Sequence, residues 1–214
     1  SIDLTSFVFP AFMVGIMLIY NRKQRYKGDF LFGIAFLFYS LVLLSDTGKS
    51  LDLQHNQAAI DFFSSFDVNS YFSILIFLLI GTIITLIVQS SAAVMAITIL
   101  LCTTGVLPIY LGIALVMGEN IGTTGTANLV ALGSNVQARR TAMAHLVFNV
   151  FGVIWVLIFF YPFVNMICRL VGYDPTAATP NATDLAKTLP IILAMFHPFF
   201  NLFNTGILIW FIPQ

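Results

Sequence analysis

The sequence has very little charge. Charged residues make up 8% of its 214 residues, whereas a typical soluble domain carries about 25%. Hydrophobic residues make up 59%, and several apolar blocks approach or exceed the roughly 20 residues that a helix needs to cross a bilayer. The formal net charge is zero, so no basic surface for nucleic acid is indicated. This composition excludes an ordinary soluble domain and predicts an all-α integral membrane protein.

Cysteine is also scarce. Cys102 and Cys168 lie in apolar surroundings and lack the CxxC spacing of a zinc or redox site. We therefore predict neither a disulfide framework nor a zinc centre, and we expect both side chains to be buried. The chain begins with Ser1 instead of Met, and residues 1–5 do not form a cationic leader. We interpret it as a piece of a longer protein without an evident signal peptide.

Polar loops divide the apolar blocks. Residues 1–45 are expected to form two membrane spans, 7–20 and 30–44, joined by a basic cytoplasmic loop. Residues 46–70 form an acidic loop that is expected on the extracytoplasmic side. Residues 71–213 then form a third region, which begins with a long stretch that has no charged residue before Glu119.

The basic residues suggest a topology through the positive-inside rule. Residues 71–104 are expected to enter and leave from outside as a re-entrant helical hairpin, which ends at a turn at Thr103-Thr104-Gly105. Residues 107–132 then cross inward as an interrupted span, which places Arg139 and Arg140 in the cytoplasm with the first basic loop. Two further spans, 142–167 and 189–212, return the C-terminus to the cytoplasm. We expect the membrane to be the plasma membrane, and the parity of the spans leaves two full spans open for 71–104.

A short polar run, Gln89-Ser90-Ser91, interrupts the charge-free stretch. Irregular backbone at membrane depth is tolerated only against protein or a watery cavity. An amide and two hydroxyls supply donors and acceptors without net charge, and a helix N-terminus beside them would favour an anion. The alternative is that the two serines only hydrogen-bond neighbouring helices together.

A second polar segment, residues 118–126, contains three glycines, three threonines, Glu119 and Asn120. Because glycine opens helices, we predict a break in which backbone carbonyls and threonine hydroxyls bind a small cation such as sodium. Glu119 is the one acid between Asp67 and Asp174, and a lone membrane carboxylate is a functional candidate. A purely structural, hydrogen-bonded Glu119 is the alternative.

The pattern HxxFN occurs twice, at His145 to Asn149 and at His197 to Asn201. In each copy, His and Asn lie one helical turn apart on one face. The pattern favours a structural role through hydrogen bonds between helices. A proton-relay role for the histidines stays open.

Together these residues resemble the type II sodium-dependent phosphate cotransporter family. Each of that family's two inverted repeats carries a QSS motif followed by a GxNIGTT motif, which stand here at 89–91 and 118–124. The resemblance implies a secondary active transporter that takes up inorganic phosphate with sodium as co-substrate and needs no other cofactor. Residues 71–213 would be one transport repeat.

The resemblance, with the reasoning above, assigns roles to individual residues. The expected phosphate ligands are Gln89, Ser90, Ser91, Asn120 and Thr123. The expected sodium ligands are Ser91, Glu119, Asn120, Gly122, Thr123 and Thr124. The expected supporting residues are His145, Asn149, His197 and Asn201.

The chain departs from the family pattern in two ways. One QSS and one GxNIGTT are present, so the second half of the site must come from a missing segment, a separate chain or a second copy. Ala92 stands where a third serine is common, which removes one hydroxyl from the site. The precise oxyanion, the sodium stoichiometry and the oligomeric state are left open.

Two other classes of function compete with transport. One is a non-transporting membrane subunit or scaffold of the same fold, which the single repeat suggests. The other is an intramembrane enzyme in which Ser90 or Ser91 is the nucleophile and His145 or His197 the base. The sequence lacks a GxSxG elbow, and no acid is evidently placed to orient either histidine, so we predict that the protein is not an enzyme.

Overall fold

The computed structural model describes residues 4–50, 52, 55–175 and 182–211. Within these ranges every regular element is a helix, as expected of an all-α membrane protein. The chain divides into two compact units, residues 1–52 and residues 53–214. The far end of the predicted region 71–213 lies outside the described residues.

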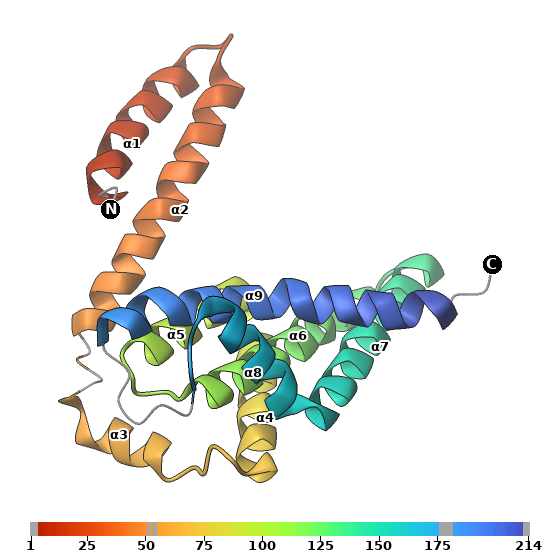
Figure 1. The fold of residues 1–214 in the computed structure, drawn as a ribbon. Coiled ribbons are helices and arrows are strands. Elements are labelled where there is room, and N and C mark those ends of the chain that lie inside the picture. Colours follow the sequence, from red (N-terminus) through yellow and green to blue (C-terminus); the bar gives the residue numbers. More distant parts are fainter. Residues whose placement is uncertain (1–3, 51, 53–54, 176–181, 212–214) are drawn as a thin grey trace. The chain divides into compact units, whose positions relative to one another are not determined.

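The first unit is a helical hairpin of α1 (Leu4–Tyr20) and α2 (Arg25–Ser50), which lie side by side (Figure 1). Their close approach depends on small residues, because a Cβ added at Gly28 would lie 2.6 Å from the backbone nitrogen of Ile19. Phe12 of α1 makes edge contacts with the rings of Phe32, Phe36 and Tyr39 of α2. Aromatic edge contacts of this kind add stabilisation beyond the buried area.

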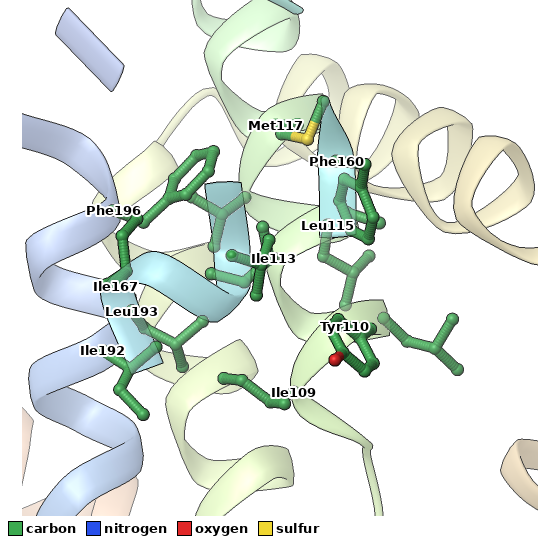
Figure 2. Packing of buried hydrophobic residues seen from close by; sticks show 14 of the residues in the cluster. Ile109, Tyr110, Ile113, Leu115, Met117, Phe160, Ile167, Ile192, Leu193 and Phe196 are labelled. Atoms are coloured by element: carbon green, nitrogen blue, oxygen red, sulfur yellow. The ribbon is translucent and has the colours of Figure 1, made fainter. Parts of the chain in front are cut away.

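The second unit contains seven α-helices among its described residues. They are α3 (Gln57–Ser64), α4 (Tyr71–Val88), α5 (Ser91–Thr103), α6 (Ile109–Ala131), α7 (Val136–Ile158), α8 (Phe160–Val171) and α9 (Ala182–Leu208), and a 3-10 turn, η2 (Ile209–Phe211), follows. α6 is central and packs against α4, α5, α7, α8 and α9. In Figure 2, Ile113 and Met117 of α6 lie in one cluster with Phe160 of α8 and Phe196 of α9.

Four described helices are long and apolar enough to cross a membrane. The four apolar segments are Arg25–Leu44, Tyr71–Val88, Val136–Ile158 and Ala186–Phe211. α6 is not in this group although it has 23 residues, and every residue of its first half from Ile109 to Glu119 is buried. A helix enclosed by other helices does not need an apolar face toward lipid. α6 therefore forms the interior of the second unit.

The predicted interruption of the span 107–132 is wrong, because α6 is one continuous helix through residues 118–126. The glycines serve contact between helices and do not open the helix. A Cβ on Gly118 would lie 2.0 Å from the carbonyl oxygen of Leu78, and one on Gly122 would lie 2.7 Å from that of Thr82. On the facing helix, a Cβ on Gly81 would lie 2.2 Å from the carbonyl oxygen of Leu115. Small residues at four-residue spacing let two membrane helices approach in this way.

The prediction of one uninterrupted span over 142–167 is also wrong. α7 ends at Ile158, and α8 begins at Phe160 after a non-helical Phe159 with φ −111° and ψ 30°. Pro162 lies in the first turn of α8, where proline is readily accommodated, and because it lacks an N–H it cannot donate the hydrogen bond to the carbonyl of Ile158 that would continue α7. The predicted turn after α5 is confirmed, since α5 ends at Thr103 and Gly105 has a φ of +76°.

Candidate functional site

The helix break at Gln89-Ser90 joins α4 to α5. Gln89 is in the left-handed conformation with φ 56° and ψ 23°, and its backbone N–H donates to the carbonyl of Thr85 at 2.8 Å. Left-handed backbone is costly for residues other than glycine, which usually ends a helix in this way. A glutamine held there points to a role for its side-chain amide.

Ser90 begins the second arm of the break. Its backbone is extended, and its hydroxyl oxygen accepts a hydrogen bond from the backbone N–H of Ala93 at 3.3 Å. The cap satisfies one of the free N–H groups at the start of α5, while the helix dipole directs positive potential toward the break. Gln89 and Ser90 are exposed and Ser91 is half-buried. The break thus presents an amide, two hydroxyls and a helix N-terminus, which is a set of donors suited to an anion.

Glu119 of α6 faces α5, the helix that begins at the break. Its side chain is 0% exposed, and Oε1 accepts a hydrogen bond from the hydroxyl of Thr98 on α5 at 3.0 Å. Oε2 is buried without a hydrogen-bond partner among the described residues. Thr98 could not be recognised from the sequence, because one threonine in an apolar helix carries no signal of its own.

The remaining polar side chains of α6 point in different directions. Residues four apart share a helix face, so Glu119 and Thr123 lie together, while Asn120 and Thr124 lie on a face rotated by about 100°. The hydroxyls of Thr123 and Thr124 donate to carbonyls of their own helix at 2.8 and 2.7 Å. Their lone pairs stay available as acceptors. Gly122 faces α4 and Thr85, so the five expected sodium ligands that belong to α6 do not lie on one face of it.

The two HxxFN motifs make the same local contact. The amide of Asn149 donates to the carbonyl of His145 at 3.1 Å, and that of Asn201 donates to the carbonyl of His197 at 2.9 Å. Both bonds are within one helix, so these asparagine amides do not make the predicted link between helices.

Two other asparagines connect the helices instead. The Asn128 amide donates from α6 to the carbonyl of Ala142 on α7 at 2.9 Å. The Asn204 amide donates from α9 to the carbonyl of Phe148 on α7 at 2.7 Å. Sequence reasoning missed both residues, although Asn204 follows the second HxxFN motif by one helical turn.

Both cysteines are buried, as predicted, and both are free thiols. Among the described residues, no three His, Cys, Asp or Glu side chains come together in a group that could hold a metal ion. The oxygen atoms that α6 and the break at Gln89-Ser90 offer a small cation are those of hydroxyls, side-chain amides and backbone carbonyls, together with the carboxylate of Glu119.

Residues 61–171 match the family model described as Na+/Pi-cotransporter. This range contains both the Gln89-Ser90-Ser91 motif and the polar segment of α6. The second HxxFN motif lies beyond it.

Several proteins are similar to the chain. The uncharacterized protein YqeW of Bacillus subtilis is 34% identical over 59% of the chain and 40% of its own length. The putative inorganic phosphate export protein YjbB of Escherichia coli is 26% identical over 93% of the chain and 33% of its own length. Human sodium-dependent phosphate transport protein 2B is 31% identical over 54% of the chain and 17% of its own length. No solved structure matches the chain.

Proposed function

Because the chain belongs to the Na+/Pi-cotransporter family, we propose that it is part of a secondary active transporter that couples the uptake of inorganic phosphate to sodium. The matched segments cover 40% or less of these three relatives, and we propose that the chain supplies one of two inverted repeats. The family is a class of transporters and not of enzymes. The hydroxyl oxygen of Ser90 caps α5 by accepting a hydrogen bond from the backbone N–H of Ala93, which is a structural role.

The helix break at Gln89-Ser90 carries this proposal. Phosphate would accept hydrogen bonds from Gln89, Ser90, Ser91 and the start of α5, where the helix dipole favours an anion. Asn120 and Thr123 of α6 would complete this half of the site. The amide nitrogen of Asn120 supports that role, because it is buried and has no hydrogen-bond partner among the described residues.

Sodium would bind through oxygens of Ser91, Glu119, Asn120, Gly122, Thr123 and Thr124. Because α6 is continuous, the side-chain oxygens are the stronger candidates, and the Gly122 carbonyl lies within the helical hydrogen-bonding pattern. The two faces of α6 would then serve different ions or different stages of transport.

The negative charge of phosphate explains why its uptake would be coupled to sodium. Moving one negative charge against a membrane potential of 100 mV costs about 2.3 kcal/mol. Bound sodium offsets the charge of phosphate and adds the energy of its own gradient. We further propose that 71–104 forms a re-entrant hairpin and that alternating access moves this unit relative to the other spans. α5 is consistent with a re-entrant arm, because its 13 residues extend about 20 Å, short of a hydrocarbon core of about 30 Å.

The direction of transport and the membrane are part of the proposal. One relative is named as a phosphate exporter and another as sodium-dependent, so the names alone do not give a direction. We propose uptake across the plasma membrane, with the basic loops and the C-terminus in the cytoplasm.

Uptake of radiolabelled phosphate into liposomes that contain the full-length native protein tests this function. An inward sodium gradient should drive uptake, and an equal potassium gradient should not. Gln89→Ala should abolish the sodium-driven part, whereas Gln137→Ala, at another exposed glutamine, should not. Equal uptake in both salts would reject sodium coupling. Absence of transport in either direction would favour the non-transporting subunit.

A further inference from the structure

An apolar cavity lies between α4 and α5, the two helices that flank the break. It has a volume of about 230 Å³ and is lined by ten described residues of α3, α4, α5 and α6, nine of them apolar. Phe63, Phe77, Ile80, Val94 and Leu115 form much of its wall. An engineered protein cavity of about 150 Å³ with a similar lining stays dry and takes up benzene. The cavity is thus large enough for a piece of hydrocarbon.

The polar side chain in this lining is Thr98, and its hydroxyl is already engaged. The Oγ1 atom lies 3.0 Å from the carbonyl oxygen of Val94 and 3.0 Å from Oε1 of Glu119. Its single hydrogen is shared between these two acceptors, so the hydroxyl has no free donor and offers a molecule in the cavity only its acceptor lone pairs. A polar occupant would lose most of its hydrogen bonds to water without replacement, which disfavours it.

The cavity borders the outer surface of α4. Leu79, Ile83 and Ile87 are exposed on the side of α4 away from α6, and α4 has the length and composition of a membrane span. Ile84 and Ile97 line the cavity and are 37% and 43% exposed, so they mark its edge toward that surface. On a helix that lies within the membrane, whether it crosses fully or forms one arm of a re-entrant hairpin, an exposed apolar surface of this kind faces lipid tails.

We propose that this cavity binds the hydrocarbon tail of a membrane lipid, which enters between Ile84 and Ile97 and packs between α4 and α5. The tail then fills space between the two helices on either side of the Gln89-Ser90 break. The proposal depends on the chain being embedded in a membrane and does not depend on which ion it transports.

Photolabelling tests this site directly. The full-length native protein is reconstituted into liposomes of phosphatidylcholine with a diazirine group along one acyl chain, irradiated and analysed by peptide mass spectrometry. Label is expected on Ile80 and Val94 inside the cavity as well as on Leu79 and Ile83 outside it. Val94→Phe, which fills the cavity, should remove the inner label and leave the outer label.

Two further variants provide an alternative block of the cavity and a control on the outer surface. Ile97→Phe narrows the entrance at a half-exposed position, so it should remove the inner label even if Val94→Phe does not fold. Ile83→Phe, on the outer surface, should leave the inner label unchanged. Outer label without inner label would overturn the proposal, because lipid would then not enter the cavity. Inner label that persists in the filled variants would also overturn it, and so would an unlabelled outer surface, which would mean that protein covers it.

Discussion

At the residue scale, Gln89 combines a strained backbone with an exposed polar side chain. Its φ of 56° is one that glycine adopts freely and other residues adopt at a cost. The side chain lies at the junction of two helices whose other residues nearby are mostly apolar. These two properties can be separated by substitution, because glycine relieves the backbone and removes the amide, while alanine removes the amide alone.

We therefore expect Gln89→Gly to stabilise the protein and still impair transport. Relief of the left-handed strain should raise the free energy of unfolding by about 1 kcal/mol, whereas Gln89→Ala should give no such gain. Both variants should lose sodium-driven phosphate uptake. Thermal unfolding in detergent and uptake into liposomes measure the two effects. Normal uptake by Gln89→Gly would show that only the backbone of this residue matters.

Thr98 and Glu119 allow a second prediction about single residues. Thr98→Val removes the one described donor to the buried carboxyl group, and an unsatisfied buried group of this kind costs about 1–3 kcal/mol. The variant should unfold at a lower temperature. Thr98→Ser keeps the hydroxyl and should unfold close to the unmodified protein. Equal stability of the valine and serine variants would mean that the hydrogen bond contributes nothing measurable.

At the scale of elements, the contact between α4 and α6 is the most extensive in the second unit. Gly118, Gly122 and Gly125 of α6 lie against α4, and Gly81 of α4 lies against α6. The hydroxyl of Thr82 adds a hydrogen bond to the carbonyl of Gly118 at 3.1 Å. We infer that the polar segment of α6 is fixed to the first arm of the break. The two would move together in any transport cycle.

This packing predicts that Gly118→Ala is poorly tolerated. The new methyl group would lie 2.0 Å from the backbone oxygen of Leu78, so the helices must separate, at a cost of about 1–3 kcal/mol or more. Gly133→Ala is the matched control, since nothing lies within 4 Å of its Cβ position. The yield of monodisperse protein and its unfolding temperature are the measurements. A Gly118→Ala protein as stable as Gly133→Ala would contradict the close contact.

The two asparagines in the C-terminal part of α9 should also differ. Asn204 is 0% exposed and donates to α7, whereas Asn201 is exposed and donates within its own helix. Hydrogen bonds between membrane helices contribute about 0.6 kcal/mol on average and up to about 1.7. Asn204→Leu should lower the free energy of unfolding by an amount in this range, and Asn201→Leu by less. A larger loss at Asn201 would reverse the assignment of structural roles.

At the scale of the whole molecule, the sequence predicts some features better than others. The break at 89–91 could be predicted, because a polar run without charge stands out within an apolar stretch. The continuity of α6 could not, because glycine both opens helices and permits close packing, and the facing backbone of Leu78 and Thr82 is not visible in the α6 sequence. The break at Phe159 was missed because Pro162 lies within an apolar run that resembles a single span.

The expected ion ligands could be predicted only in part, because the sequence of one helix does not show which residues of other helices face it. Residue type and helical spacing indicate which side chains of α6 can bind an ion, but they do not show that Glu119 faces Thr98. Nor do they show that Asn128 and Asn204 connect helices, since an isolated asparagine in an apolar helix has many possible partners. These roles depend on which helices are neighbours.

Phosphate is proposed to bind at the start of α5 and to need sodium for this binding. Ala92 is exposed and directly follows Ser91, while Cys102 and Cys168 are buried, so Ala92→Cys gives a reporter that the chain's own thiols do not obscure. The measurement is its rate of modification by a charged thiol reagent in the full-length native protein, with other accessible cysteines replaced. Phosphate should slow the reaction in sodium and not in potassium, and a cysteine at exposed Gly133 should react equally in both. If phosphate in sodium left the rate at Ala92→Cys unchanged, the phosphate site could not be at the start of α5.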